Sequence, residues 1–365
     1  MLRAILIDIV PPFMPAIDAA YRLSEAESLI KTYGGIVLLK TIQRRFEPEY
    51  RTYIGSGKAE ELLQDAIIHD ANIIIVNNDL KPGQIYNLTE LYRKNKVEVW
   101  DRIDLILKIF QKHAETKEAR LEIELASLKH MGPRIFGMGM ELSRQGGGIG
   151  TKGIGETNTE IMKRHLAKQE KKIRDDLEVC LKRRKLQIDN RKRKKLKTIS
   201  IIGYTNAGKS SLLNTMTKKG ALAANKLFAT LDTRVGKLYL QNISQEILLT
   251  DTIGFIADLP HSLINSFRAT LIETVHADIL MHVIDSNDPR IDEKMKVVDE
   301  VLFSLEIGNK PILYVFNKID LLPYEELLFL KEKYKNFSPI FLSSKTKAGI
   351  TDLMKVISVY IQKKE

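Results

Sequence analysis

The sequence contains almost no cysteine and no long apolar run. Cys180 is the only cysteine in the 365-residue chain, which excludes an internal disulfide framework and a zinc site built from several cysteines. Because no stretch of about 18 uninterrupted apolar residues occurs, no membrane-spanning helix is expected. The opening residues carry Arg3, Asp8 and two consecutive prolines, a pattern unlike that of a signal peptide. We therefore expect a protein of the reducing cytoplasm.

The residues that are present indicate an ordinary globular chain. Hydrophobic residues make up 44% of the sequence and charged residues 28%, which is sufficient for sizeable cores and excludes disorder throughout. A chain of this length is expected to form two or three domains. Nothing in the sequence requires more than a monomer.

The net charge of +11 is concentrated in one segment. Residues 161–197 contain 16 Lys and Arg but five Asp and Glu, an excess equal to the net charge of the whole chain. An apolar stripe is expected from residues that recur mostly four and seven apart: Ile161, Leu166, Ile173, Leu177, Leu181 and Ile188. No Pro or Gly occurs in 156–197, so one long helix with a basic exposed face is predicted. The density of Lys and Arg favours a nucleic-acid partner. An ordinary solvated surface and an anionic membrane surface are the alternatives.

The N-terminal zone, 1–103, has the alternation of an α/β domain. Four short apolar runs are typical of buried strands: 4–10, 36–42, 73–76 and 97–100. Amphipathic stretches lie between them, so a small domain with a mainly parallel sheet is expected. The segment Gly55-Ser56-Gly57-Lys58 fits a strand–turn–helix connection, and a second nucleotide site able to take ATP is the alternative.

The middle zone, 104–197, combines two long helical patterns with a glycine-rich break at 143–156. Helices joined in this way are predicted to form an antiparallel hairpin that packs through apolar seams. The C-terminal zone, 198–365, alternates strand and helix patterns again and is predicted to be a separate domain. Its expected strands are 199–203, 235–241, 246–250, 279–284, 312–316 and 340–342.

The C-terminal zone contains the most specific motif of the chain. An expected strand and an amphipathic helix flank a match to G-x-x-x-x-G-K-[ST], formed by Gly203, Tyr204, Thr205, Asn206, Ala207, Gly208, Lys209 and Ser210. Glycines let successive backbone N–H groups point at phosphate oxygens, and the following helix N-terminus adds partial positive charge. Lys209 places a full charge near the outer phosphates, and the Ser210 hydroxyl is a candidate Mg²⁺ ligand. The pattern predicts a phosphate-binding loop.

A second motif points to guanine. It matches N-K-x-D after an expected strand and consists of Asn317, Lys318, Ile319 and Asp320. The Asp320 carboxylate can accept hydrogen bonds from N1–H and the 2-amino group of guanine, whereas adenine has no donor at either position. The motif therefore predicts a GTP site. A loop that supports the base is expected after the last strand, at Ser343, Ser344 and Lys345.

Two further motifs are expected near the γ-phosphate and the metal. The first ends an expected strand as D-x-x-G and consists of Asp251, Thr252, Ile253 and Gly254. Asp251 is placed to hold Mg²⁺ through water, and the Gly254 amide to meet the γ-phosphate. The second consists of Phe228, Ala229, Thr230, Leu231 and Asp232. We expect Mg²⁺ as cofactor with Ser210 and Thr230 as ligands, and catalytic roles for Lys209, Asp251 and Gly254.

One group that such a site commonly contains is missing. The residue after D-x-x-G is usually a Gln that positions the attacking water, but here it is Phe255, which cannot polarise water. Intrinsic hydrolysis is therefore expected to be slow, or another group or a partner completes the site. This favours a switch activated by a large partner over a fast metabolic enzyme.

Together these motifs resemble those of the HflX family of translational GTPases, and the resemblance covers nearly the whole chain. The apolar residue after D-T-x-G is itself a habit of that family, and residues 53–58 and 143–156 look like its N-terminal signatures. The chain departs from the family pattern at 154–160, which reads IGETNTE where PGETQLE is usual, and at 132–134. The resemblance implies three parts: a small α/β domain, a long helical hairpin and a Ras-like P-loop GTPase domain.

The resemblance also implies association with the large (50S) ribosomal subunit, in ribosome splitting or rescue, or in ribosome biogenesis and protein synthesis. The residues by themselves indicate GTP or GDP and a polyanionic partner, without naming the ribosome or its rRNA. We therefore expect a Mg²⁺-dependent GTPase that binds the large subunit. The alternative is an RNA-binding assembly factor that uses GTP mainly as a conformational ligand with little turnover, and Phe255 keeps this alternative open.

Overall fold

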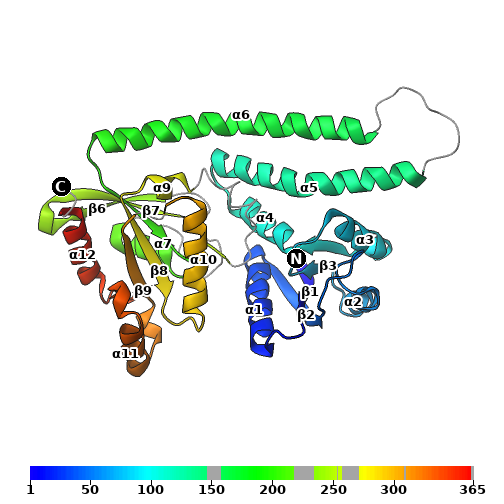
Figure 1. Ribbon diagram of the computed structural model, residues 1–365, viewed down its shortest axis with the longest axis horizontal. Coiled ribbons are helices and arrows are strands. Elements are labelled where there is room, and N and C mark those ends of the chain that lie inside the picture. Colours follow the sequence, from blue (N-terminus) through cyan, green and yellow to red (C-terminus); the bar gives the residue numbers. More distant parts are fainter. Residues whose placement is uncertain (146–157, 218–233, 253, 257–270, 308–309, 363–365) are drawn as a thin grey trace. The chain divides into compact units, whose positions relative to one another are not determined.

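The computed structural model describes residues 1–145, 158–217, 234–252, 254–256, 271–307 and 310–362, with the backbone alone at 133, 135–145, 158 and 159 (Figure 1). The chain forms two compact units. Unit 1 comprises Met1–Lys112 and Ile123–Asp176, and unit 2 comprises His113–Glu122 and Leu177–Glu365. The division runs through two long helices, so each of them contributes one part to each unit.

Unit 1 is built on a four-stranded sheet with the order β2-β1-β3-β4, in which all neighbours are parallel. Strands and helices alternate along the chain: β1 (Leu2–Val10), α1 (Ala16–Tyr33), β2 (Gly35–Arg44), α2 (Ser56–Ile68), β3 (Ile73–Val76), α3 (Pro82–Tyr92), β4 (Glu98–Asp101) and α4 (Arg102–His113). The central strands β1 and β3 are almost entirely buried, as expected for a parallel sheet with helices on both faces. The alternation predicted for 1–103 is confirmed.

Local signals fix where these helices begin and end. Pro82 occupies the first turn of α3, where a backbone N–H would lack a helical partner in any case. α1 ends at Gly34, whose φ of +100° suits glycine and whose N–H bonds to the carbonyl groups of Ile30 and Lys31. The GSGK segment forms the start of α2, and its Lys58 pairs with Glu61 across one helical turn at 2.6 Å.

Two long helices, α5 (Lys117–Gln145) and α6 (Asn158–Arg193), follow α4. In unit 1, a Cβ placed on Gly132 of α5 would lie 3.9 Å from the Leu166 side chain of α6. In unit 2, Glu118 of α5 pairs with Arg184 of α6 at 2.8 Å. The contacts run in opposite order along the two helices, as the predicted antiparallel hairpin requires.

Unit 1 also buries charged side chains at the carboxyl ends of its strands. The Asp8 carboxylate accepts hydrogen bonds from Arg22 and Asn77, both at 2.9 Å. Arg102 donates to the Asn77 side chain at 2.7 Å and pairs with Glu25 at 2.7 Å. An opposite charge or a strong hydrogen bond therefore accompanies each of these buried charges and offsets its lost hydration.

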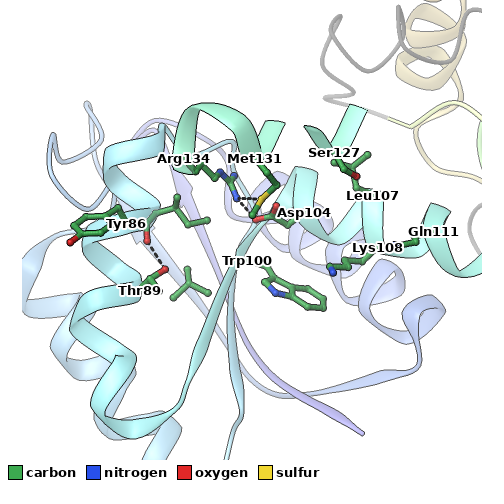
Figure 2. Close-up of a pocket in the computed structure, with 12 residues that line it drawn as sticks. Tyr86, Thr89, Trp100, Asp104, Leu107, Lys108, Gln111, Ser127, Met131 and Arg134 are labelled. Carbon is green, nitrogen blue, oxygen red and sulfur yellow. Dashed lines mark hydrogen bonds and ion pairs between the residues drawn. The ribbon is translucent and has the colours of Figure 1, made fainter. Parts of the chain in front are cut away.

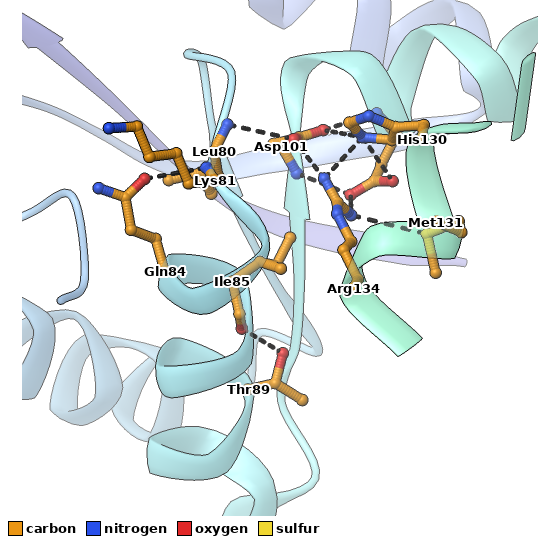
Figure 3. A network of polar contacts seen from close by, with 10 residues as sticks. Leu80, Lys81, Gln84, Ile85, Thr89, Asp101, His130, Met131 and Arg134 are labelled. Atoms are coloured by element: carbon orange, nitrogen blue, oxygen red, sulfur yellow. Dashed lines mark hydrogen bonds and ion pairs between the residues drawn. The ribbon is translucent and has the colours of Figure 1, made fainter. Parts of the chain in front are cut away.

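A second buried network lies where β4 ends and α4 begins (Figure 3). Arg134 of α5 donates to Asp101 at 2.5 Å and to Asp104 at 2.7 Å. The backbone N–H of Asp104 donates to Asp101 at 2.8 Å, and that of Asp101 donates to the Asp104 carboxylate at 3.1 Å. This reciprocal pairing caps α4 and fastens α5 to it.

Unit 2 contains a six-stranded sheet with the order β10-β9-β8-β5-β7-β6, in which only the β6–β7 pair is antiparallel. Its strands are β5 (Thr198–Ile202), β6 (Arg234–Leu240), β7 (Gln245–Asp251), β8 (Ile279–Asp285), β9 (Ile312–Asn317) and β10 (Ile340–Phe341). Its described helices are α7 (Lys209–Thr217), α9 (Ile272–His276), α10 (Ile291–Ser304), α11 (Tyr324–Lys333) and α12 (Ile350–Gln362). Short 3₁₀ turns of the chain are Arg93–Asn95, Gln241–Ile243, Ile319–Leu321 and Lys335–Phe337.

The predicted fold class is confirmed: an α/β domain and a helical region precede a parallel α/β domain that carries the phosphate-binding loop. The domain boundaries at 103 and 197 stay a prediction. No helix in the described part of the chain combines the length and apolar character that a membrane span needs.

Candidate nucleotide-binding site

The phosphate-binding loop connects the central strand β5 to α7. β5 is fully buried, and α7 begins at Lys209. The φ of Gly208 is +92°, and a Cβ there would lie 2.2 Å from Nδ2 of Asn317, so this position requires glycine. Asn206 also has a positive φ, of 63°. The loop therefore has the tight curvature that the sequence motif predicts.

The Lys209 side chain is folded against this loop. Its Nζ donates to the carbonyl oxygens of Gly203 at 3.0 Å and Tyr204 at 2.7 Å, and the residue is 6% exposed. Burial lowers the pKa of Lys209 to about 8, although the Asp251 carboxylate opposes this shift, while Lys318 adds to it. The ammonium group thus lies at the loop backbone, beside the position expected for the outer phosphates.

The D-x-x-G segment starts at the carboxyl end of β7, next to the loop. Ser210 Oγ donates to Asp251 Oδ2 at 2.6 Å, and Asp251 is fully buried. Thr252 Oγ1 donates to the Ile201 carbonyl of β5 at 2.7 Å. Because β5 and β7 are parallel neighbours, their carboxyl ends lie side by side. This brings the two groups expected near the metal, the Ser210 hydroxyl and the Asp251 carboxylate, into direct contact.

Gly254 and Phe255 lie against the phosphate-binding loop. The Phe255 N–H donates to the Gly203 carbonyl at 3.2 Å, and the Phe255 carbonyl accepts from the Thr205 N–H at 2.7 Å. A Cβ on Gly254 would lie 2.9 Å from Lys209 Nζ and 2.8 Å from a Thr205 methyl carbon. A side chain at position 254 would therefore collide with Lys209 and Thr205, so the close approach of this backbone to the lysine requires glycine.

The Phe255 side chain is buried among apolar residues. It is 3% exposed and belongs to an apolar cluster with Ile202, Leu271 and Ala277. A buried phenyl ring in such surroundings cannot orient a water molecule. The geometry therefore agrees with the sequence expectation that this residue does not replace the missing Gln.

The N-K-x-D motif follows β9 and contacts two neighbouring loops. Asn317 Nδ2 donates to the Ala207 carbonyl at 2.9 Å, and Asn317 Oδ1 accepts from the N–H and the hydroxyl of Ser344, both at 2.9 Å. The carboxamide is almost completely buried. It therefore links the phosphate-binding loop to the loop that follows β10.

The charged residues of this motif have partners of their own. Lys318 Nζ pairs with Asp285 Oδ2 at the end of β8 at 2.6 Å. Asp320 Oδ1 accepts from the Ser343 hydroxyl at 2.6 Å. Asp320 is exposed whereas Ser343 is buried. The serine therefore fixes the carboxylate from the protein interior and leaves it accessible to a nucleotide base.

Six of the predicted site residues lie outside the described residues: Phe228, Ala229, Thr230, Leu231, Asp232 and Ile253. Ile319 is half-buried within the N-K-x-D turn, and Lys345 is exposed next to Ser344. The remaining predicted residues gather around the carboxyl ends of β5, β7 and β9, with the base and phosphate motifs joined through Asn317.

A buried ion-pair cluster beside this site was missed by the sequence analysis. Glu273 of α9 is 3% exposed, and its carboxylate lies 2.9 Å from Arg191 and 3.5 Å from Arg184, both on α6. Arg184 pairs in addition with Glu118 of α5 at 2.8 Å. We call this group, Glu118, Arg184, Arg191 and Glu273, the α6 clamp.

The helix that carries Glu273 is also attached to the nucleotide site. Thr274 Oγ1 lies 3.0 Å from Ser200 Oγ of β5, three residues before the phosphate-binding loop. Leu271 and Ala277, which flank α9, share an apolar cluster with Phe255. α9 and the residues that flank it therefore contact α6, β5 and Phe255.

The α6 clamp corrects one expectation about the basic segment. Arg184 and Arg191 are half-buried rather than exposed, because they continue the stripe that Leu177 and Ile188 bury on α6. At the other end of the helix the expected stripe is wrong at Ile161, which is 46% exposed. The Lys and Arg residues at 182, 183, 185 and 192–195 are exposed, so a basic face is present.

Comparisons with known proteins cover nearly the whole chain. The family models described as GTP-binding GTPase N-terminal, GTP-binding GTPase Middle Region and 50S ribosome-binding GTPase match residues 20–111, 113–191 and 198–318. GTPase HflX of Caldanaerobacter subterraneus subsp. tengcongensis is 44% identical over 335 residues, which are 92% of this chain and 76% of that protein. GTPase HflX of Escherichia coli is 37% identical over 336 residues, 92% of this chain and 78% of that protein.

A solved structure shows the same similarity. The crystal structure of a GTP-binding protein from the hyperthermophilic archaeon Sulfolobus solfataricus, in complex with GDP, has 26% sequence identity to this chain and a TM-score of 0.51. The match covers 100% of both chains.

The substitution Asp320→Asn tests the base motif. We expect GTP affinity to fall about 10- to 100-fold, because the neutral amide has one acceptor oxygen and cannot accept from both guanine donors. Xanthosine triphosphate should become the better ligand, because the amide can donate to its additional carbonyl. Titration of both nucleotides measures the change. Ser343→Ala, which keeps the carboxylate, is the control and should have a smaller effect; unchanged GTP affinity in Asp320→Asn would contradict the assignment.

The lowered pKa of Lys209, about 8, predicts a pH dependence of nucleotide binding. Phosphate oxygens favour the charged ammonium, so binding raises this pKa and takes up a proton when the pH lies at or above 8. GTP affinity should therefore decrease as the pH rises through 8. Calorimetric titration in buffers of different ionisation enthalpy measures the proton uptake, and binding at about pH 8.5 without uptake would contradict the prediction.

Proposed function

The chain belongs to the HflX family of GTPases, and from this membership we propose that it is a Mg²⁺-dependent GTPase that acts in the cytoplasm, as a monomer, on the large (50S) ribosomal subunit. The proposed roles are ribosome splitting or rescue, or ribosome biogenesis. The observation that carries the proposal is the α6 clamp, which connects the basic helix to the surroundings of the nucleotide site within unit 2. A polyanion bound to α6 can thereby act on the site where GTP binds.

The proposed chemistry is in-line attack of water on the γ-phosphate of GTP, with the rate set by positioning and charge stabilisation. Lys209 stabilises negative charge on the transferred group, and the backbone N–H of Gly254 meets the γ-phosphate. The close approach of Gly254 to the lysine supports this pair of roles, since a Cβ there would lie 2.9 Å from Nζ. Asn317 and Asp320 hold the guanine end.

The oxygen donors beside the phosphate-binding loop fit a magnesium ion. The Ser210 hydroxyl lies 2.6 Å from the Asp251 carboxylate, and Mg²⁺ prefers such hard oxygen ligands together with several waters. We propose Ser210 and Thr230 as direct ligands and Asp251 as a residue that acts through water. Mg²⁺, when bound, neutralises charge on the β- and γ-phosphate oxygens.

The exposed basic face of α6 supports rRNA as the partner. The Lys and Arg residues at 182, 183, 185 and 192–195 are exposed, and closely spaced cations bind phosphates through counterion release. One of the matching family models is described as a 50S ribosome-binding GTPase. We propose that 104–197, taken as a helical domain between 1–103 and 198–365, carries the principal RNA contact.

Unit 1 has a second surface whose side chains are suited to binding RNA. Phe13, Phe46 and Tyr50 are 79%, 82% and 86% exposed on the loops that follow β1 and β2. Arg44 holds these loops together by donating to the Pro12 carbonyl at 2.9 Å. Exposed aromatic rings among arginines stack on unpaired bases, so this surface is proposed as an additional contact to RNA.

A second candidate function keeps the RNA partner but not rapid turnover. Phe255 is buried in an apolar cluster, and no residue of the described site replaces the Gln that would position water. The protein would then be an RNA-binding assembly factor in which GTP is a conformational ligand. The two functions differ in whether the partner accelerates hydrolysis.

Hydrolysis of GTP with increasing amounts of purified large ribosomal subunits tests the proposal. We expect a slow basal rate and a saturable increase, because the described part of the site has no water-positioning side chain and the partner must supply this function. Isolated small subunits are the control and should give no increase. A flat rate with every ribosomal particle would leave GTP binding intact and favour the assembly-factor function.

A variant of the same experiment tests the basic face of α6. The variant replaces four cationic residues with Gln: Lys192, Arg193, Lys194 and Lys195. It should bind the large subunit more weakly. The slope of log affinity against log salt concentration should decrease in magnitude by up to about 3, since each phosphate contact contributes roughly 0.7–0.9. A matched control carries four Gln substitutions at exposed lysines outside α6: Lys296, Lys331, Lys335 and Lys355. Equal slopes in the two variants would make the basic run an ordinary solvated surface.

The substitution Glu273→Gln tests the α6 clamp. We expect GTP affinity and the basal rate to stay within about twofold, while stimulation by the large subunit falls about tenfold, which lies within the usual range of coupling between sites. Glu170→Gln, which breaks an exposed pair with Arg174 within α6, is the matched control and should leave stimulation unchanged. The charge-swapped variant Glu273→Arg with Arg191→Glu should recover part of it; full stimulation in Glu273→Gln would exclude the clamp as a connection.

A further inference from the structure

Unit 1 contains a cavity that the nucleotide chemistry does not use. It has a volume of about 460 Å³ and lies between α3, β4, α4 and α5 (Figure 2). Much of its lining is apolar or aromatic and includes Tyr86, Val99, Trp100 and Met131. A cavity of this size and lining, with a few polar groups, is typical of sites for small organic ligands.

One wall of the cavity is fixed by the buried network of α4 and α5. Arg134 and Asp104 are part of the lining, and Arg134 is committed to Asp104 at 2.7 Å and Asp101 at 2.5 Å. The backbone N–H groups of Asp101 and Asp104 are bonded to each other's carboxylates. The described lining therefore offers neither a free guanidinium group nor free first-turn N–H groups, which a polyphosphate would need.

Lys108, unlike Arg134, is a cation of the cavity lining that is not committed to a carboxylate in the described part of the chain. Its Nζ lies 5.8 Å from the centroid of the Trp100 ring, and no carboxylate of the described residues lies within ion-pair distance of it. The Trp100 N–H already donates to Glu98 at 3.1 Å, and the ring meets Tyr33 edge-on at 5.5 Å. The cavity thus presents one available positive charge next to an indole ring whose N–H is satisfied.

From this arrangement we infer that unit 1 binds a small aromatic monoanion, with its ring in the apolar cavity beside Trp100 and its single acidic group on Lys108. Ser127 and Gln111, which also line the cavity, supply hydrogen-bonding groups that fix the orientation of the ring. One ammonium group suits one acidic group, which separates this ligand class from nucleoside polyphosphates. The inference is independent of the GTPase function, because all the lining residues belong to unit 1.

The experiment uses the full chain and the fact that Trp100 is its only tryptophan. The probes are 8-anilinonaphthalene-1-sulfonate, an aromatic monoanion, and N-phenyl-1-naphthylamine, the same ring system without the charge. Energy transfer from the excited tryptophan reports a probe bound near Trp100, and the cavity-filling variant described below assigns that probe to the cavity. We expect saturable transfer to the sulfonate, tighter binding of the sulfonate than of the neutral probe, and no displacement by ATP at concentrations equal to that of the probe.

Two kinds of variant separate the cavity from general apolar binding. Lys108→Gln should weaken binding of the sulfonate about fivefold, the effect of a partly exposed ion pair, and change binding of the neutral probe less than twofold. Lys112→Gln, one turn along α4 and outside this cavity, is the matched control. Ser127→Phe fills the cavity and should abolish transfer to both probes. Because Lys108 is exposed, its variant is expected to fold even where the filling variant does not.

Three results would overturn the inference. Wild-type transfer in a folded Ser127→Phe variant would place the probe elsewhere. An equal loss of both probes in Lys108→Gln, or a loss as large in Lys112→Gln, would remove the acidic group from the ligand class. Displacement by ATP would show that the cavity accepts polyphosphates after all.

Discussion

The carboxamide of Asn317 joins the two ends of the nucleotide site. Its nitrogen bonds to the carbonyl group of Ala207 in the phosphate-binding loop, and its oxygen accepts two hydrogen bonds from Ser344 behind the base motif. The same side chain requires Gly208, because a Cβ there would lie 2.2 Å from Nδ2. The spacing between the phosphate and base positions is therefore set before any nucleotide binds, and neither loop can move without breaking a buried hydrogen bond.

Much of the fold and of the site followed from local patterns. The strands of both sheets are short apolar runs bounded by turn residues, and the phosphate-binding loop and N-K-x-D are contiguous motifs whose geometry the backbone of a few residues determines. The partners Asp285 and Glu273 could not be found in this way, because each meets a charge that lies 33 or more residues away. Arg184 and Arg191 did carry a signal: they continue the spacing of Leu177 and Ile188, which indicates an inward face.

The buried polar residues of unit 1 show the same limit. Asp8 stands in strongly apolar surroundings of the sequence, whereas Arg102 follows Asp101 directly, and nothing local indicates that Asn77 bonds to both Asp8 and Arg102. Parallel strands bring their carboxyl ends together from distant parts of the chain, so networks at that edge depend on the topology of the sheet rather than on any one segment. The cavity beside Trp100 likewise requires α3, β4, α4 and α5 at once.

The spacing of the α6 clamp gives it a mechanical meaning. Arg184 and Arg191 are seven residues apart on α6, about 10.5 Å at 1.5 Å per residue, and both pair with Glu273. A single ion pair would let the helix rotate about the contact, whereas two attachments along the helix also restrain its tilt. Within unit 2, a displacement of this part of α6 therefore has to move α9 with it or break a pair with a buried carboxylate.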